Sequence, residues 1–172
     1  MTPPDYLVLD SPVGALRLIA RGDHLAAVLW PDERPGRVPM PTPRANPAHP
    51  VLQQARAQLL AYFAGELRCF DLPLDFAGTE FQQRVWQALL AIPYGQTRSY
   101  AEIARQLDAP AAVRAVGAAN GRNPLSIIAP CHRVVGATGA LTGFAGGLTA
   151  KTWLLRHEGL EIAAGRIRPP AG

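Results

Sequence analysis

Three residues with reactive or charged side chains, Cys131, His132 and Arg133, stand side by side inside the apolar run IIAPCHRVVG (residues 127–136). A thiol becomes a nucleophile as its thiolate, a form that a neighbouring cation or general base favours. A buried, inert thiol is the alternative, because free cysteine is among the most buried residue types. Adjacent residues on an extended strand point to opposite faces. A site shared by Cys131 and His132 therefore requires a turn at this point or a bridging water.

A histidine that acts as a general base needs a third group to orient it. Glu158 is the candidate, because a carboxylate at the negative end of a helix dipole gains from a specific partner. The histidines and cysteines lack the spacing of a zinc site, so the sequence predicts neither a metal nor a cofactor. Cys69 is expected to be a free thiol, packed near the boundary between two domains.

The elements that must position these residues fall into two halves. The first half is expected to hold four short strands and one helix: strands over 6–9, 15–20, 24–30 and 67–76, and a helix over 51–63. Seven prolines over 31–50 indicate a surface connection between them. The second half is expected to be helical over 80–92, 100–107, 111–120 and 148–157, with a frayed tail from Glu161.

Two of these helices, 100–107 and 111–120, are joined by a tight turn and have helix-turn-helix proportions. Ser99 and Glu102 are expected to form a capping box at the start of the first. The predicted fold class is therefore α+β. Residues 1–78 would form a structural N-terminal domain, a small antiparallel sheet with a helix. Residues 79–172 would form a mostly helical C-terminal domain that contains the helix-turn-helix.

The two halves also differ in charge. Residues 1–78 carry 7 Arg against 8 Asp and Glu, whereas residues 79–172 carry 10 Arg and Lys against 5. Codon bias can account for an arginine excess, but less easily for its segregation, which indicates a polyanionic partner such as nucleic acid. No apolar run approaches the roughly 18 residues that cross a bilayer. With no signal-peptide pattern in MTPPDYLVLD, we expect a cytoplasmic chain with no membrane partner.

Over residues 79–160 the sequence resembles the O6-alkylguanine-DNA alkyltransferase family. The resemblance rests on short motifs in the family's order and spacing: VW at 85–86, IP at 92–93, TRSY at 97–100, RAVG at 114–117, NPLSIIAPCHRVV at 123–135, GG at 146–147 and HEG at 157–159. The N-terminal half matches only loosely, as a variable domain does.

The resemblance implies repair of guanine alkylated at O6 by direct, irreversible transfer of the alkyl group, once per protein molecule. Cys131 would attack the alkyl carbon, His132 would deprotonate it through a water, and Glu158 would orient His132. Tyr100 would donate to guanine N3. Asn123 would fix the turn that joins the recognition helix to the active-site segment.

The same resemblance implies how the base is reached. A helix with small side chains would enter the minor groove, and Arg114 would fill the stack while the damaged base turns out. The implied DNA-binding residues are Arg114, Tyr100, Ala115, Gly117 and Arg122. The implied substrate-binding residues are Val134, Phe144, Ala145 and Gly146. The partner would be double-stranded DNA containing O6-alkylguanine, bound by a monomer, with cooperation along DNA left open.

One departure from the family and two other classes of function remain to be weighed. Family members often have tyrosine and serine where Phe144 and Ala145 stand, which predicts a changed substrate range. A sensor of alkylated DNA would leave Cys131 inert, so that a Cys131→Ser variant would behave like the wild type. A Cys-His hydrolase would use the adjacent pair for acyl transfer, but the basic half and the helix-turn-helix do not support it.

Overall fold

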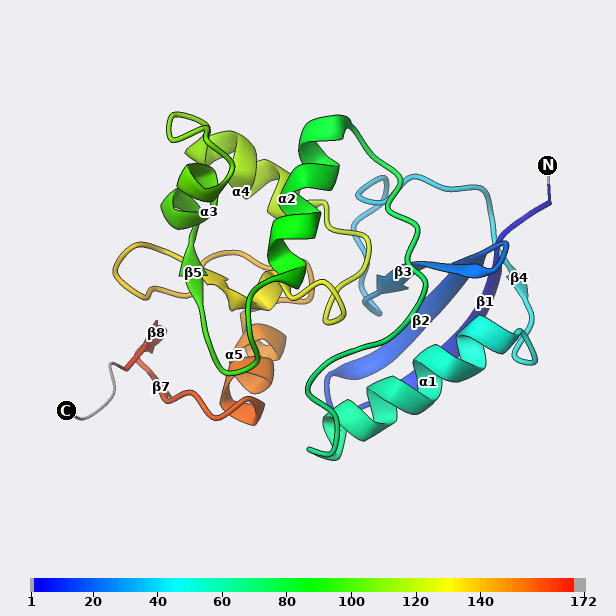
Figure 1. The fold of residues 1–172 in the computed structure, drawn as a ribbon. Coiled ribbons are helices and arrows are strands. Elements are labelled where there is room, and N and C mark those ends of the chain that lie inside the picture. Colours follow the sequence, from blue (N-terminus) through cyan, green and yellow to red (C-terminus); the bar gives the residue numbers. More distant parts are fainter. Residues whose placement is uncertain (1, 169–172) are drawn as a thin grey trace. The chain divides into compact units, whose positions relative to one another are not determined.

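The computed structural model describes residues 2–168 and divides into two compact units (Figure 1). The first unit comprises the chain up to Ala77 together with Pro124–Ile128. The second comprises Gly78–Asn123 and the chain from Ala129 onwards. Among the residues described, no helix is both long and apolar enough to cross a membrane.

A four-stranded sheet forms the first unit, in the order β3-β2-β1-β4. Its strands are β1 (Asp5–Ser11), β2 (Gly14–Arg21), β3 (His24–Leu29) and β4 (Arg44–Ala45). The first three form an antiparallel meander, and β4 pairs with β1 in parallel. The predicted meander is confirmed, whereas β4 lies in the proline-rich stretch for which the sequence predicts only a connection.

The helix α1 (Pro50–Phe63) crosses one face of this sheet (Figure 1) and packs against β1, β2 and β3. Pro50 stands in the first turn, where its missing N–H costs nothing. The side chain of His49 accepts a hydrogen bond from the Val51 N–H at 3.1 Å and so caps the helix. The buried face of α1 closes the core of the first unit with Val51, Leu52, Ala55, Leu59 and Tyr62.

The outer edge of β3 is covered by chain from elsewhere in the first unit. The Leu25 N–H donates to the Pro73 carbonyl at 2.8 Å, and Leu25 forms an isolated parallel bridge with Leu74. The predicted strand over 67–76 is wrong beyond this bridge, because Pro73 has no N–H with which to continue a ladder. The contact still protects the edge, since unpaired edge groups recruit other strands.

The segment Pro124–Ile128 covers the same strand further along. Its first carbonyl accepts from the Val28 N–H at 2.8 Å, and Trp30 Nε1 donates to Ser126 Oγ at 3.0 Å. Ile127 takes φ of +73°, which is unusual for a β-branched residue and costs backbone strain. The buried contacts of its neighbours hold the chain in this conformation just ahead of Cys131.

The helices α2 (Glu80–Leu90), α3 (Tyr100–Gln106) and α4 (Val113–Gly121) pack against one another in the second unit (Figure 1). Capping boxes start the first two, formed by Thr79 with Gln82 and by Ser99 with Glu102, as expected for Ser99. The third begins later than predicted, because the Ala112 N–H closes a turn onto the Ala109 carbonyl before the helix starts.

A tryptophan fixes the spacing between α2 and α4. The Nε1 of Trp86, a buried residue, donates to the Ala119 carbonyl at 2.8 Å. The backbone of Gly78 lies against the same ring, and a Cβ there would come within 2.6 Å of it. The start of α2 is therefore packed too tightly for a side chain at Gly78.

The rest of the second unit surrounds the Cys131 segment. It comprises β5 (Arg98–Ser99), the short 3-10 helix η1 (Cys131–Arg133), β6 (Val134–Val135) parallel to β5, α5 (Leu148–His157) and the hairpin of β7 (Ile162–Ala163) and β8 (Arg166–Ile167). The prediction of a frayed tail from Glu161 is wrong as far as Arg168, because Ala164 and Gly165 take positive φ and turn the chain into the hairpin. Its last four residues, 169–172, lie outside the described part.

Candidate active site and candidate DNA-binding helix

Cys131 lies on a turn and not on a strand. It begins η1, where its own N–H donates to the Ala129 carbonyl at 2.7 Å and the Arg133 N–H donates to the Pro130 carbonyl at 2.9 Å. The alternation of a strand therefore does not apply to Cys131 and His132. The sequence required a turn at this point for Cys131 and His132 to share a site, and the structure has that turn. The Cys131 side chain is buried.

His132 and Glu158 form a fully buried hydrogen-bonded pair. The distance from His132 Nε2 to Glu158 Oε2 is 2.7 Å. Burial lowers the pKa of His132, and the charges of Arg133 and Lys151 act in the same direction, against the opposing effect of Glu158. An imidazole kept neutral in this way donates from Nε2 to the carboxylate and leaves Nδ1 as an acceptor. Within residues 2–168, Nδ1 is buried and makes no hydrogen bond, so it is the atom available to take a proton.

Arg133 holds the carboxylate of this pair, a role that the sequence does not assign to it. Its Nε donates to Glu158 Oε1 at 2.7 Å, its Nη2 to Oε2 at 3.0 Å, and its Nη1 to the Ile92 carbonyl at 2.7 Å. The guanidinium is buried and lies 5.7 Å from the centre of the Tyr94 ring. The sequence feature that could have indicated this role is an arginine inside an apolar run. A buried arginine needs a partner such as a carboxylate.

The charge of Glu158 is maintained by its two partners. Burial alone would raise the pKa of this carboxyl group. The hydrogen bonds and charges of His132 and Arg133 outweigh burial and hold that pKa far below its ordinary value. Glu158 is therefore a carboxylate at neutral pH, fixed in position by the bidentate arginine while it orients the imidazole.

Lys151 is a second charged residue whose role the sequence does not predict. It is fully buried on α5, and its Nζ donates to the Val134 carbonyl at 2.7 Å and to the Thr142 carbonyl at 3.4 Å. Burial lowers its pKa from 10.5 to about 8, and the charge of Cys131 opposes this lowering. Because the attraction is mutual, the ammonium group favours the thiolate of Cys131.

Two further predicted residues lie beside this cluster. The hydroxyl of Tyr100, at the start of α3, is 2.5 Å from Thr142 Oγ1. Asn123 is fully buried, and its Nδ2 donates to the Ala129 carbonyl at 2.8 Å. This bond joins the chain just after α4 to the residue two positions before Cys131. It therefore helps to fix the turn that carries Cys131.

The predicted DNA-binding residues lie on or beside α4. Exposed positions recur along one side of this helix and just past its end: Arg114, Ala115, Ala118, Gly121 and Arg122. This side therefore combines small side chains with an arginine at each end. Gly117 differs, because it is half-buried and a Cβ there would lie 3.8 Å from the Tyr100 ring.

The four predicted substrate-binding residues lie on β6 and in the loop ahead of α5. Val134 is buried, and its carbonyl already accepts from Lys151, which leaves one lone pair for a ligand. Phe144, Ala145 and Gly146 are half-buried, and the centre of the Phe144 ring is 5.9 Å from Lys151 Nζ. The expectation for Cys69 is wrong: its side chain is exposed, not packed.

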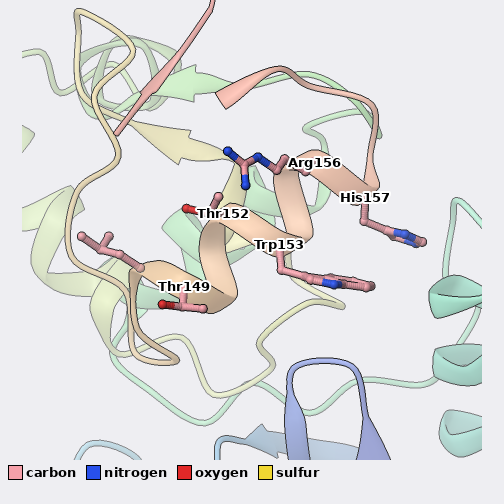
Figure 2. A pocket seen from close by; sticks show the side chains of 6 residues that line it. Thr149, Thr152, Trp153, Arg156 and His157 are labelled. Carbon is pink, nitrogen blue, oxygen red and sulfur yellow. The ribbon is translucent and has the colours of Figure 1, made fainter. Parts of the chain in front are cut away.

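The outer side of α5 is separate from this cluster. A shallow depression there is lined by Leu148, Thr149, Thr152, Trp153, Arg156 and His157 (Figure 2). The rings of Trp153 and His157 stack with their centres 4.8 Å apart. None of these residues is among the predicted site residues, whereas Lys151 and Glu158 belong to the inner, buried side of α5 and the residue that ends it.

Fold and site together define a class of protein. A helix-turn-helix, in which α4 presents a small and basic exposed face, shares one compact unit with a buried cysteine beside a histidine–carboxylate pair. The first is a feature of DNA-binding proteins, and the second is a feature of proteins with a nucleophilic thiol.

Comparison with known proteins identifies the family. Residues 80–160 match the 6-O-methylguanine DNA methyltransferase DNA-binding domain, and residues 6–76 match the ribonuclease-like domain of the same family. A methylated-DNA--protein-cysteine methyltransferase of Mycobacterium leprae is 54% identical over 156 residues, which cover 90% of this chain and 92% of that protein. The chain belongs to the 6-O-methylguanine DNA methyltransferase family.

Solved structures agree with this assignment. The crystal structure of Mycobacterium tuberculosis OGT in complex with DNA has a TM-score of 0.78 and 52% identity, covering 90% of this chain and 92% of that one. The structure of the Mycobacterium tuberculosis O6-methylguanine methyltransferase has a TM-score of 0.79 and 51% identity, covering 92% and 93%. The predicted α+β fold class and the predicted family are therefore confirmed.

Proposed function

We propose that this protein repairs DNA by transferring the alkyl group of O6-alkylguanine to Cys131, irreversibly and once per molecule. The observation that carries the proposal is the buried His132–Glu158 pair beside Cys131, which Arg133 holds in place, together with the charge of Lys151 acting on Cys131. Relatives at about half identity are methylated-DNA--protein-cysteine methyltransferases, which supports the same activity here.

The geometry of the cluster supports the following steps of transfer. Neutral His132 takes the thiol proton at Nδ1 through a water, and Glu158 stabilises the imidazolium that forms. The thiolate attacks the alkyl carbon, so that an S–C bond forms while the C–O6 bond breaks. The electron pair of the broken bond passes to guanine, where Tyr100 donates to N3. Cys131 ends as a thioether, and nothing in the cluster reverses that step.

The small, basic side of α4 supports the approach to the base. Alanine and glycine residues there allow the helix to approach the floor of a minor groove. Arg114 is exposed and long enough to occupy the gap between stacked bases after the damaged guanine has turned out. Arg122 lies at the other end of the same side and contributes a phosphate contact. Ala115 lies between them, and Gly117 lies next to the Tyr100 ring.

The base would be held by the loop ahead of α5. The carbonyls of Cys131 and Val134 accept from the exocyclic amine, Phe144 walls the pocket, and the Ala145 N–H reaches O6, with Gly146 allowing close approach. Asn123 keeps the turn before Cys131 in place. In this proposal residues 79–172 carry out the chemistry and contact DNA, and residues 1–78 are structural. The protein acts as a monomer on double-stranded DNA in the cytoplasm.

Intact-protein mass spectrometry after incubation with a short duplex containing one O6-methylguanine tests the chemistry. The wild type should gain one methyl group, located on the peptide that holds Cys131, whereas Cys131→Ser should gain none. Cys69→Ser is the matched control, because Cys69 is the other cysteine and is exposed. Binding to the lesion without any gain in mass would overturn the proposal in favour of a damage sensor.

A binding titration tests the role of α4. Arg114→Ala should weaken binding to the lesion duplex and slow transfer, because both the groove contact and the filling of the stack are lost. Arg56→Ala removes an equal charge from an exposed position on α1 and serves as the control. Equal effects of the two substitutions would mean that only overall charge matters, and would contradict this use of α4.

A further inference from the structure

The hydroxyl of Tyr100 has a specific partner in the loop that leads to α5. The oxygen of Tyr100 lies 2.5 Å from Thr142 Oγ1, and each hydroxyl can serve as donor or acceptor. The two residues are 42 positions apart, and both side chains are half-buried. The contact therefore links the first residue of α3 to a loop that starts after β6.

The side chain of Thr142 is held in this orientation from several sides. Its carbonyl accepts from Lys151 Nζ at 3.4 Å. Its methyl group lies towards Gly136, where a Cβ would be 3.8 Å from Thr142 Cγ2. A β-branched side chain has few χ1 choices, so contacts on the methyl group and the backbone direct Oγ1 towards Tyr100. The backbone carbonyl of Thr142 and the Val134 carbonyl share the same ammonium group.

We propose that Thr142 is a positioning residue for the alkyl transfer. It orients the hydroxyl of Tyr100, and it donates a hydrogen bond to the Tyr100 oxygen while Tyr100 donates to the guanine. This inference rests on the proposed function. Before the base enters, Thr142 accepts from Tyr100 and holds the ring in place. Once guanine N3 is within reach, Tyr100 turns its proton to N3 and Thr142 turns its own proton to Tyr100.

The chemical reason is the charge that develops on the leaving base. As the S–C bond forms and the C–O6 bond breaks, the electron pair moves onto guanine, and the Tyr100 hydrogen bond to N3 stabilises it. The phenol oxygen becomes more negative as its proton moves to N3. A hydroxyl that donates to that oxygen strengthens the donor, because hydrogen bonds in a chain polarise one another. The thiol proton goes to His132, and solvent restores the proton of Tyr100 after the base has left.

Single-turnover transfer from an O6-methylguanine duplex to the full-length protein tests the inference. Thr142→Val keeps the shape and removes the hydroxyl, and should lower the transfer rate constant at saturating protein roughly fivefold, the worth of one ordinary hydrogen bond. Thr142→Ser should recover most of the rate. Thr138→Val makes the same chemical change at an exposed position of the same loop and should leave the rate unchanged.

A double-mutant cycle separates positioning from loop packing. In a Tyr100→Phe background, Thr142→Val should cause no further fall in rate, because its effect passes through the Tyr100 hydroxyl. The same fall in both backgrounds would assign Thr142 to packing and overturn the inference. A wild type that transfers at the same rate as Thr142→Val would overturn it too, with the proposed function intact. A wild type that transfers nothing would overturn both together.

Discussion

Replacing Lys151 by methionine tests how a buried cation affects both stability and chemistry. Lys151 has no exposed surface, and burial is the main reason that its pKa falls from 10.5 to about 8. The folded protein therefore releases this proton near pH 8, while the unfolded chain keeps it up to about pH 10.5. Between these values the unfolded state binds more protons, so the free energy of unfolding rises with pH.

The size of the effect follows from the same two values. One pH unit of difference is worth about 1.4 kcal/mol, so the wild type should gain about 2.5 kcal/mol relative to Lys151→Met between pH 7 and pH 10. At pH 7 the variant escapes the cost of burying the charge. It also leaves the Val134 carbonyl without its 2.7 Å partner, a loss of roughly 1–3 kcal/mol. The two effects nearly offset each other at pH 7, and the pH dependence distinguishes them.

Urea denaturation of both proteins at half-unit steps from pH 7 to pH 10 measures this difference. Groups that Lys151 does not act on titrate alike in both proteins, so Lys151 and the nearby thiol of Cys131 separate the two curves. At pH 7 the transfer rate of Lys151→Met should be lower than that of the wild type, because the variant lacks the ammonium group that favours the Cys131 thiolate. Parallel stability curves, with equal transfer rates of the two proteins at pH 7, would refute the assignment of a buried, titrating Lys151 that acts on Cys131.

Three further predictions concern packing and the charged cluster. Arg133→Lys keeps the charge but loses the bidentate contact with Glu158, and chemical denaturation should show a loss of about 1–3 kcal/mol, with slower methyl transfer in the mass assay. Gly78→Ala should lower stability by about 1–3 kcal/mol in thermal unfolding, because its Cβ would meet the buried Trp86 ring; Gly143→Ala, with nothing within 4 Å, is its control. Gly117→Ala should raise stability by about 0.5–1 kcal/mol, since alanine suits a helix better and its Cβ would make an ordinary contact; a loss of stability in the same assay would contradict that packing.

Much of the fold followed from local patterns. The meander over β1 to β3 could be predicted, because period-two alternation and turn glycines act between neighbours in the chain. The capping box of Ser99 and Glu102 is similarly local, since both its hydrogen bonds lie within three residues. Local patterns could not decide whether residues 67–76 form a strand. Whether an extended segment joins a sheet depends on which edge packing brings to it, and here only Leu74 forms a bridge.

The candidate site divides along the same line. The sequence by itself identified the family and predicted the nucleophile and its adjacent histidine, because these depend on residue types at fixed short spacings. Glu158 could be proposed as a partner, but Arg133 and Lys151 could not be assigned their contacts. Buried charges pair with whatever the folded chain places beside them, and Arg133 meets Glu158 across 25 residues.

Only the tertiary structure decided which hydroxyl faces Tyr100 and which carbonyls hold the Lys151 ammonium group. Thr142 carries no local sign of either contact, because its partner Tyr100 lies 42 residues away and the loop between β6 and α5 has no periodic pattern. The physical reason is general. Backbone propensity, capping and turn chemistry act over a few residues, whereas the partner of a buried polar group is set by close packing of distant segments, which must satisfy every such group at once.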